Sequence, residues 1–496
     1  MPSAHTKLRD WMQHPAYRPW LAALAGAIGV LCFAPFDLFW LAPLVWLSLF
    51  GLLRNADSPR QAALTGWAFG SAFFLGGVSW IYVSLSAFGG MPWWLAGPAT
   101  LAFCVALAGY PALAGWAFKR WQPEKHWQQA FLFAALIAAV DWLRSWIFTG
   151  FPWLSLGYSQ TVPSPLAGFA PLIGVFGLSL IVAFCSALLL RWRIGVPVLL
   201  AFCLCGFGLR QIAWTQPDGE PISVALIQGN IPQDMKFQPG AFIRTLSLYR
   251  DLIAANPAQL TVLPETALPA FINHLPTDYL EELKTLARRQ GGDLIVGTIT
   301  GERDSSYYNS AVSLGSSPLQ IYSKQHLVPF GEMIPAGFAW FMAYANIPMS
   351  SFSAGPASQP PMAVSGRNIA VNICYEDVFG DEIIRALPQA GILVNLSNTA
   401  WFGDSLAQPQ HLQIAQMRSA ETGRPMLRAT NTGMTAIIDQ HGQLKTALPP
   451  FETAVLIGSI SAYVGQTPFG RFGNLPFLGL LMTSLLLSQW PRRHTS

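Results

Sequence analysis

Charged residues are scarce in this chain. Only 11% of its 496 residues are Asp, Glu, Lys or Arg, and 52% are hydrophobic, whereas soluble proteins carry about 25% charged residues. The formal net charge is only +4. No basic stripe with interleaved aromatic residues is present, so no nucleic-acid partner is expected. Because the apolar residues gather in Leu21–Trp214 and near the carboxyl end, we predict a membrane protein with a soluble domain between these parts.

Eight segments are apolar over nearly the length of about 20 residues that a membrane-spanning helix needs. They are Leu21–Phe36, Leu38–Leu53, Ala62–Leu85, Trp94–Phe118, Ala130–Phe148, Leu166–Leu190, Ile194–Ala213 and Leu475–Trp490. The first two are short and adjacent, so a re-entrant hairpin is an alternative for them. We expect an α-helical membrane domain of seven spans at 1–214, a soluble domain at 221–466, and a last span with its tail at 474–496.

Lys and Arg are absent from every second loop between these segments, such as Ser86–Trp93 and Thr149–Pro165. The alternate loops and the termini hold the basic residues Lys7, Arg9, Arg18, Arg54, Arg60, Lys119, Arg120, Lys125, Arg191, Arg193, Arg492 and Arg493. By the positive-inside rule, both termini are expected in the cytoplasm. The soluble domain is then predicted on the outer side, which is the periplasmic side of a bacterial inner membrane.

Two ionisable residues, Asp141 and Arg144, lie within one of the apolar segments. They are three residues apart, so they share one face of a helix and can form an ion pair. An ionisable pair at membrane depth is a candidate for function. A satisfied structural pair is the alternative, and the sequence leaves both open.

Cysteine is almost absent from the soluble domain. Five of the six cysteines lie in the apolar segments, where Cys behaves as a small apolar residue, namely Cys32, Cys104, Cys185, Cys203 and Cys205. Only Cys374 lies in the soluble domain. A single cysteine cannot form a disulfide within that domain, so Cys374 is either core filler or a reactive thiol.

Short β-branched or apolar runs alternate with helical patterns in the soluble domain, which predicts an α/β fold. The expected strands are Ile222–Ile227, Leu260–Leu263, Asp293–Thr298, Ser310–Leu314, Asn368–Cys374, Gly391–Leu396, Thr435–Asp439 and Ala454–Ser459. The expected helices are Tyr279–Arg289, Asp381–Leu387 and Pro409–Thr422.

Three reactive side chains, Glu265, Lys324 and Cys374, stand at or just after the ends of strand-like runs. A thiol becomes a nucleophile only after it loses its proton, and Glu265 could be the base. Lys324 could stabilise the oxyanion of a tetrahedral intermediate and lower the pKa of the thiol. This pattern predicts acyl transfer through a thioester on Cys374.

The segments around these residues resemble the nitrilase superfamily, whose members carry a Glu-Lys-Cys triad on an αββα sandwich. They are Leu263-Pro-Glu265, Lys324-Gln-His-Leu-Val-Pro-Phe-Gly-Glu332 and Asn372-Ile-Cys-Tyr-Glu376. The resemblance implies Glu265 as general base, Lys324 as transition-state stabiliser and Cys374 as nucleophile. The supporting residues that it implies are Glu332, Tyr375 and Glu376. For the two glutamates, an ion-paired or solvated carboxylate is the alternative.

A nitrilase-like domain inserted between apolar spans is similar to the apolipoprotein N-acyltransferase family, the membrane-anchored branch of that superfamily. Thr149–Tyr158, Gln228–Gln233 and Asn398–Asp404 agree with this family. The resemblance implies ping-pong transfer of an acyl chain from a phospholipid, phosphatidylethanolamine, to a protein. The acceptor would be the α-amino group of the N-terminal diacylglyceryl-cysteine of apolipoproteins. Lipoprotein maturation would then be complete.

No cofactor and no metal are expected. His411 and Asp404 match no metal-binding spacing, so His411 is expected at the surface or in support of a loop. Candidate substrate or lid contacts are Phe237, where the family often has Trp, and the aromatic residues Trp340, Phe341 and Trp401.

The apolar run Ala336–Pro348, which contains Trp340 and Phe341, predicts a mobile lid that contacts lipid. A buried helix is the alternative.

Two other functions also remain open. One is a membrane-anchored amidase that uses water as acceptor, and the other is a transporter or scaffold whose outer domain only binds a ligand.

Overall fold

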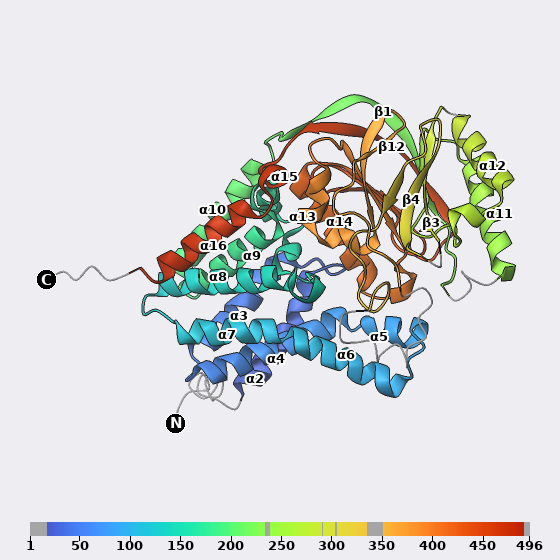
Figure 1. Cartoon of the computed structure of the whole chain (residues 1–496). Helices are drawn as coiled ribbons and strands as arrows, with labels where there is room; N and C mark the ends of the chain where they lie inside the picture. The colour runs from blue at the N-terminus through green and yellow to red at the C-terminus, as the bar shows by residue number, and fades with distance from the viewer. Residues whose placement is uncertain (1–16, 234–238, 290, 303–304, 335–350, 491–496) are drawn as a thin grey trace. The chain divides into compact units, whose positions relative to one another are not determined.

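The computed structural model describes residues 17–233, 239–289, 291–302, 305–334 and 351–490. The chain divides into two units, which are described separately. The first is helical and consists of the described parts of Met1–Tyr82, Trp94–Ile212 and Phe472–Ser496. The second consists of Val83–Trp93 and Ala213–Arg471 and contains every strand of the described residues (Figure 1).

Two six-stranded sheets form the centre of the second unit. The first has the order β12-β1-β2-β3-β4-β5, with bounds β1 Thr215–Gln228, β2 Leu260–Val262, β3 Asp293–Gly301, β4 Tyr307–Gly315, β5 Ile321–Ser323 and β12 Ala454–Gly465. The second has the order β11-β10-β9-β8-β7-β6, with bounds β6 Met362–Val364, β7 Arg367–Ile373, β8 Ile392–Ser397, β9 Met426–Thr430, β10 Ala436–Ile438 and β11 Leu444–Ala447. β2 is parallel to its neighbours β1 and β3, and β8 is parallel to its neighbours β7 and β9.

The two sheets pack face to face, because one apolar cluster joins their inner faces, with members such as Val224, Val262, Ile373 and Leu427. A second cluster packs the outer face of the first sheet against α11 Pro239–Ala255 and α12 Thr277–Arg288. A third packs the outer face of the second sheet against α13 Gly380–Ile383 and α14 Ala407–Thr422. The result is the αββα sandwich that the resemblance implies, with α11 and α12 covering the β3–β4 side (Figure 1).

Each of the eight expected strands overlaps an observed strand. The expected helices correspond to α12, to α13 with the 3-10 turn that follows it, and to α14. The sequence interpretation missed the edge strands β6 and β11 and also β9, which lies between β8 and β10. It also missed α11, which precedes β2.

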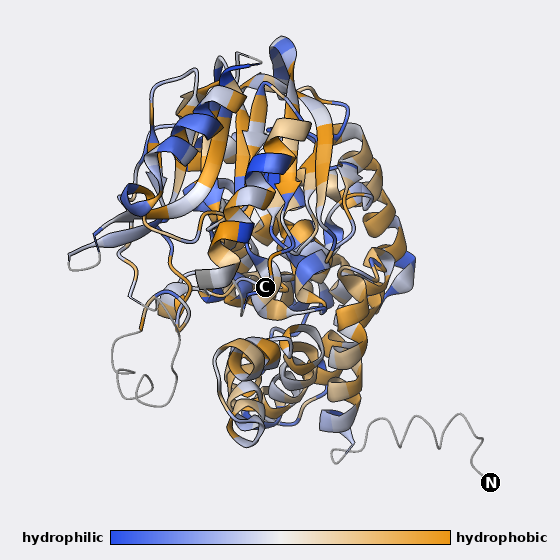
Figure 2. Cartoon of the chain, turned by 90° about the vertical axis from the view of Figure 1, so that its right-hand side faces the viewer, coloured by the Kyte–Doolittle hydropathy of each residue, from blue (hydrophilic) through white to orange (hydrophobic). Residues whose placement is uncertain are grey.

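The helical unit is built from apolar helices (Figure 2). Their bounds are α2 Arg18–Gly29, α3 Ala42–Arg54, α4 Pro59–Val78, α6 Trp93–Leu107, α7 Gly109–Arg120, α8 His126–Arg144, α9 Ala170–Leu189, α10 Trp192–Leu209 and α16 Leu475–Ser488. Short helices continue α4 as α5 Ile81–Val83 and precede α16 as α15 Pro468–Phe472. α9 is the inner helix, since 83% of its most apolar window is buried.

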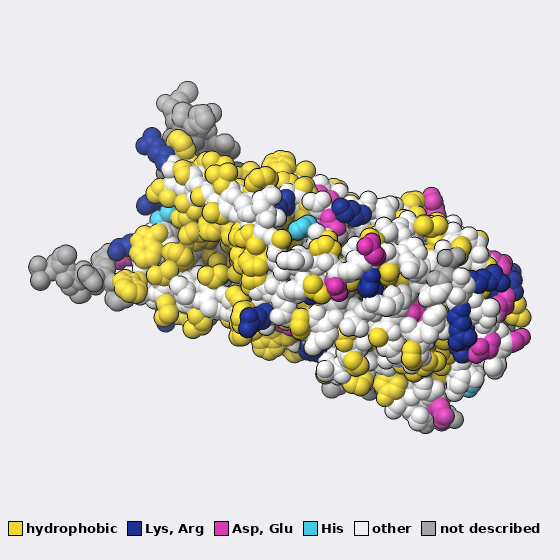
Figure 3. Space-filling model, turned by 90° about the horizontal axis from the view of Figure 1, so that it is seen from above, with side chains coloured by type: hydrophobic (Ala, Val, Ile, Leu, Met, Phe, Trp, Pro, Cys, Tyr) yellow, Lys and Arg dark blue, Asp and Glu magenta, His cyan; other side chains and the backbone are white. Residues whose placement is uncertain are grey.

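α10 is the opposite case, since only 11% of its most apolar stretch of 18 residues is buried. Leu204 on α10 and Leu486 on α16 are 73% and 66% exposed. Hydrophobic side chains gather in the left part of the view from above (Figure 3). Such an apolar exterior fits a hydrocarbon environment and not water.

The expectation of eight membrane spans is wrong by the length and composition of the described helices. Three are long and apolar enough, namely Trp93–Arg120, Pro165–Leu189 and Trp192–Leu209. Pro59–Val78 and Ile81–Phe88 make a fourth if this pair, bent by 58°, is one span. Three of the other expected segments form shorter apolar helices, namely Arg18–Cys32, Phe39–Arg54 and Leu475–Ser488. For example, α16 has 14 residues and reaches about 21 Å at about 1.5 Å per residue, less than the roughly 30 Å of hydrocarbon.

Asp141 and Arg144 form an ion pair of 3.2 Å at the end of α8. The Arg144 guanidinium also donates to the carbonyl oxygens of Phe151 (2.5 Å) and Trp153 (2.6 Å). The second oxygen of Asp141 accepts from the Leu156 amide (2.8 Å) and from a serine hydroxyl on α9. The pair thus holds the loop after α8 in place, which favours the structural interpretation.

Replacing Arg144 with Met should destabilise the helical unit, because the Asp141 carboxylate stays buried without its counter-charge. Breaking a buried pair in this way costs about 3–5 kcal/mol of the free energy of unfolding. Thermal unfolding in detergent micelles measures the loss. The matched control is Arg250→Met, which removes an ion pair of 2.8 Å at the surface of the other unit and should change little. Equal stability of the two variants would contradict the structural role of Arg144.

Candidate active site

Glu265, Lys324 and Cys374 lie in one cluster. Glu265 follows β2, Lys324 follows β5 directly, and Cys374 follows β7 directly. The Lys324 Nζ lies 3.2 Å from Glu265 Oε1. Cys374 is within electrostatic reach of both, since the Glu265 charge raises the pKa of its thiol and the Lys324 charge lowers it. Both sheets of the sandwich therefore contribute to the cluster.

The Glu265 carboxylate is held by donors on two sides. Its Oε1 accepts from the Asn309 side-chain amide at 2.8 Å, and its Oε2 accepts from the backbone amide of Asn398 at 2.9 Å. Its loop lies directly against β3. A Cβ atom on Gly297 would stand 2.3 Å from the Pro264 carbonyl oxygen, so only glycine allows this approach. The orientation of the carboxylate is thus fixed before any substrate arrives.

Lys324 is buried between two carboxylates. Its side chain is 1% exposed, and its Nζ lies 2.8 Å from Glu332 Oε2 as well as 3.2 Å from Glu265. Burial lowers the pKa of Lys324, but the charges of Glu265 and Glu332 raise it by more, so the pKa is raised overall. The ammonium is therefore a permanent positive charge at the site. Glu332 is therefore an ion-paired carboxylate, and its role in support of the lysine stays a prediction.

Cys374 lies at a sharp turn of the backbone. Ile373 is extended, and Cys374 has a φ of +52° and begins the 3-10 turn Cys374–Val378. This left-handed conformation is costly for a residue with a side chain, and such strain gathers at functional sites. Burial raises the pKa of the thiol, the Glu265 charge raises it further, and the net shift is upward. The resting thiol is therefore protonated and needs a base.

Glu376 ties the lysine loop to the cysteine turn. Its carboxylate accepts from the backbone amides of Ile373 (2.6 Å), Gln325 (2.7 Å) and His326 (3.2 Å) and from the Tyr322 hydroxyl (3.0 Å). Burial raises the pKa of Glu376 to about 7, although these amides and the charge of the neighbouring lysine lower it. The carboxylate is thus a buried brace and is not solvated.

Tyr375 follows Cys374 directly and is buried. Its ring packs edge-on against His326 at 5.8 Å and Phe379 at 5.2 Å between centroids. These contacts brace the same turn.

Asn309 was missed by the sequence interpretation. Its amide nitrogen lies on β4 and donates to Glu265 Oε1 and to Glu332 Oε1, both at 2.8 Å. Its backbone carbonyl accepts from the Lys324 amide at 2.8 Å. A polar residue within an otherwise buried strand is the only signal in the sequence. One side chain thus aligns both carboxylates around the ammonium.

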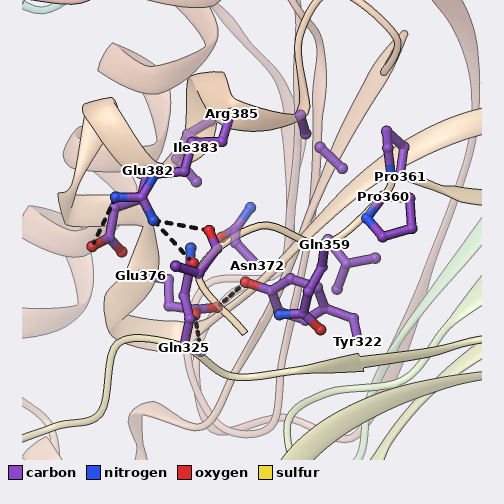
Figure 4. Close-up of a pocket in the computed structure, with 14 residues that line it drawn as sticks. Tyr322, Gln325, Gln359, Pro360, Pro361, Asn372, Glu376, Glu382, Ile383 and Arg385 are labelled. Atoms are coloured by element: carbon purple, nitrogen blue, oxygen red, sulfur yellow. Dashed lines mark hydrogen bonds and ion pairs between the residues drawn. The ribbon is translucent and has the colours of Figure 1, made fainter. Parts of the chain in front are cut away.

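A small pocket lies beside the Glu376 brace (Figure 4). Its volume is about 30 Å³, which is room for roughly two water molecules. Tyr322, Gln359 and Asn372 line it together with Glu376. The pocket is too small for a lipid chain.

Of the candidate substrate and lid residues, the structure describes only Trp401. Trp401 is half-buried in the 3-10 turn Thr399–Phe402, where its carbonyl accepts from the Ser84 hydroxyl at 2.8 Å and its ring meets Phe88 edge-on at 5.7 Å. The expected lid run Ala336–Pro348, with Trp340 and Phe341, lies outside the described residues, as does Phe237.

His411 is not at the surface, contrary to one of the two expectations for this residue. It is 1% exposed, and its Nε2 lies 2.7 Å from Asp377 Oδ1. In the described part of the chain, no group of three or more His, Cys, Asp and Glu side chains is arranged to hold a metal ion.

Two family models match the chain. One, described as apolipoprotein N-acyltransferase N-terminal domain, covers residues 25–188, and the other, described as carbon-nitrogen hydrolase, covers residues 223–469. An apolipoprotein N-acyltransferase from Nitrosomonas europaea is 49% identical over 95% of this chain and 98% of its own length. The chain belongs to the apolipoprotein N-acyltransferase family.

Other members of the apolipoprotein N-acyltransferase family are similar over nearly their whole length. The enzyme from Chromobacterium violaceum is 44% identical over 95% of this chain and 94% of its own. That from Vibrio vulnificus is 38% identical over 99% and 100%. Among solved structures, an amidase from Nesterenkonia sp. matches with a TM-score of 0.39 and 18% identity over 53% of this chain and 97% of the amidase.

Replacing Asn309 with Asp should strongly reduce acyl transfer. The change puts a third carboxylate beside Glu265 and Glu332 and removes both hydrogen bonds. A hydrogen bond to a charged group is worth about 1.5–3 kcal/mol, so we expect the rate to fall about 100-fold or more. Asn256→Asp is the matched control, since Asn256 only donates to the Leu252 carbonyl on α11. Unchanged activity of Asn309→Asp would show that Asn309 does not align the carboxylates.

Proposed function

We propose that the chain N-acylates apolipoproteins through a thioester on Cys374, with Glu265 as general base and Lys324 as oxyanion stabiliser. Membership of the family makes the chain an acyltransferase of lipoprotein biosynthesis. One observation carries the assignment of these residues. The buried Lys324 ammonium lies 3.2 Å from Glu265 and 2.8 Å from Glu332, and it is close to Cys374, which is the only cysteine in the sequence of the second unit. A nucleophile, a base and a fixed cation are what thioester chemistry requires.

In the first half-reaction, the Cys374 thiol transfers its proton to Glu265 and attacks the carbonyl carbon of a phospholipid ester. The carbonyl oxygen becomes an oxyanion, which the Lys324 ammonium stabilises. The intermediate collapses by breaking the bond to the glycerol oxygen. Glu265 returns the proton to that oxygen, so the lysophospholipid leaves as an alcohol and the acyl chain stays on sulfur.

In the second half-reaction, the α-amine of the lipoprotein cysteine attacks the thioester carbonyl. Glu265 takes a proton from the attacking amine, and Lys324 again stabilises the oxyanion. The carbon–sulfur bond breaks, the amide forms, and the proton on Glu265 restores the Cys374 thiol. Since each product leaves before the next substrate reacts, the kinetics should be ping-pong. No step requires a metal or a cofactor.

The donor is proposed to be phosphatidylethanolamine, and the acceptor the diacylglyceryl-cysteine at the amino terminus of an apolipoprotein. Both substrates carry acyl chains that stay in a membrane. The exposed apolar surface of α10 and α16 supports a location of the enzyme in the same membrane.

The catalytic unit is proposed to face the periplasm from the bacterial inner membrane. α10 begins between Arg191 and Arg193, and the positive-inside rule favours the cytoplasm for such basic residues. Its other end leads into β1 and thus into the sandwich. Arg210 at that end donates to the Ser164 carbonyl, so this charge is engaged within the protein.

Mass spectrometry of the protein after incubation with phospholipid tests the thioester. We expect an acyl adduct on Cys374 that disappears when a diacylated lipopeptide is added, with the acyl chain then on the peptide amine. Cys374→Ala should carry no adduct and have no activity. The matched control is Cys205→Ala, because Cys205 is the exposed cysteine of α10 and its loss should leave adduct and turnover unchanged.

Two outcomes would overturn the proposed function. A fully active Cys374→Ala variant would exclude the thioester and favour a binding protein. Hydrolysis of a soluble amide without an acyl adduct from phospholipid would instead favour an amidase with water as acceptor.

A further inference from the structure

A buried polar network lies behind the cysteine turn, on the side of β8 and β9. Its members come from five elements of the second sheet's half of the sandwich: β7, the turn itself, β8, β9 and α14. They are Asn372, Asp377, Asn395, Ser397, His411 and Arg428, and each is at most 2% exposed. The mechanism derived above uses none of these side chains.

Asn395 contacts the backbone of Cys374, and His411 has a backbone hydrogen bond to Cys374 as well. The amide nitrogen of Asn395 donates to the carbonyl oxygen of Cys374 at 3.1 Å and to the Asn372 side-chain oxygen at 2.6 Å. The carbonyl oxygen of a residue in a strained left-handed conformation needs such a donor, because the backbone at this point leaves the regular ladder of β7. Asn395 therefore holds Cys374 at its φ of +52°.

Arg428 fixes the orientation of Asn395. Its guanidinium Nη1 donates to Asn395 Oδ1 at 2.9 Å, and the Ser397 hydroxyl donates to the same oxygen at 2.6 Å. An asparagine amide can flip by exchanging its oxygen and its nitrogen. With two donors on the oxygen, the nitrogen must face the Cys374 carbonyl.

The charge of Arg428 is balanced within the network. The same Nη1 lies 2.9 Å from Asp377 Oδ2, and the other oxygen of Asp377 lies 2.7 Å from the His411 Nε2. Burial lowers the pKa of His411 despite the neighbouring carboxylate, so the imidazole is neutral. One cation and one anion thus remain, both fully buried and both paired, which makes their burial tolerable.

We propose that Arg428 is a positioning residue for the nucleophile, which acts through Asn395 to hold the backbone of Cys374 in its reactive conformation. The inference rests on the proposed role of Cys374 as nucleophile. Arg428 itself does not touch the substrate. A displacement of the thiol by a fraction of an ångström is enough to slow an attack that depends on alignment.

The same arrangement adds a second cation to the surroundings of the thiol. The charges of Glu265, Lys324, Glu332 and Asp377 act on the pKa of Cys374. Arg428 is linked to the Cys374 backbone through Asn395, and the Cys374 thiolate raises the pKa of Arg428. Loss of the Arg428 charge should therefore make the thiolate harder to form.

The test measures the rate of alkylation of Cys374 by a small thiol reagent as a function of pH, in the full-length enzyme with its other cysteines replaced. In Arg428→Gln we expect the midpoint of this profile to rise by about one pH unit or more. We expect kcat to fall about tenfold or more, with KM for phospholipid unchanged. Arg428→Lys restores the charge and should return the midpoint most of the way.

The matched control is Arg424→Gln. Arg424 is equally buried and donates to the carbonyl oxygens of Ala390 and Gly465, both at 2.7 Å, and no contact links it to Cys374. This variant should lose stability but keep the alkylation midpoint. A shift as large as that of Arg428→Gln would mean that general loosening, and not positioning, moves the profile.

A milder variant covers the case in which Arg428→Gln fails to fold. Ser397→Ala removes one donor from Asn395 and leaves every charge in place. It should lower kcat by a smaller factor without changing KM. If a folded Arg428→Gln keeps the midpoint and kcat of the unchanged enzyme, or if Ser397→Ala keeps kcat when it alone folds, the proposal is overturned.

The alkylation profile does not depend on acyl transfer, so it separates this proposal from the proposed function. An enzyme with an acyl adduct on Cys374 but an unaltered profile in the variants retains its function and loses the role of Arg428. The absence of any adduct would reject the thioester instead.

Discussion

The second unit, which holds the candidate active site, depends on one interaction. It is the ion pairing of the Lys324 ammonium with the carboxylates of Glu265 and Glu332. One cation and two carboxylates leave one net negative charge away from water. Such a charge is tolerable only when every oxygen is engaged by a donor. Asn309 and the backbone amides of Val328 and Asn398 supply these donors. The loops that carry them follow strands, so the sandwich has to be complete before the cluster can form.

The cluster also explains why the residues come from distant parts of the chain. A single sheet would present the three side chains along one edge, whereas two sheets packed face to face can bring Lys324 and Cys374 together from opposite sides. Glu376 joins the two sides by accepting amides from both loops at once. The brace and the cluster are therefore parts of one rigid arrangement.

The sequence predicted those features that depend on a local pattern of apolar and polar residues. Glu265, Lys324 and Cys374 were located because they stand at the ends of apolar, β-branched runs, which make strands visible. β9 was missed because Arg428 and Thr430 interrupt its apolar pattern. Only the tertiary pairing with Asp377 and Asn395 makes an arginine acceptable in a central strand. Asn309 was missed for the same reason, because only its contacts with Glu265 and Glu332 make this polar side chain acceptable in a buried strand. The number of spans was overestimated because an apolar window does not reveal where a helix bends or ends.

The left-handed backbone of Cys374 has a consequence for the thermodynamics of the whole enzyme. A side chain at that φ costs about 1–2 kcal/mol relative to the right-handed conformation, and glycine would be free of this cost. Glycine at position 374 would remove this backbone cost, but it would also leave a cavity in the apolar cluster between the sheets, where the Cys374 side chain packs.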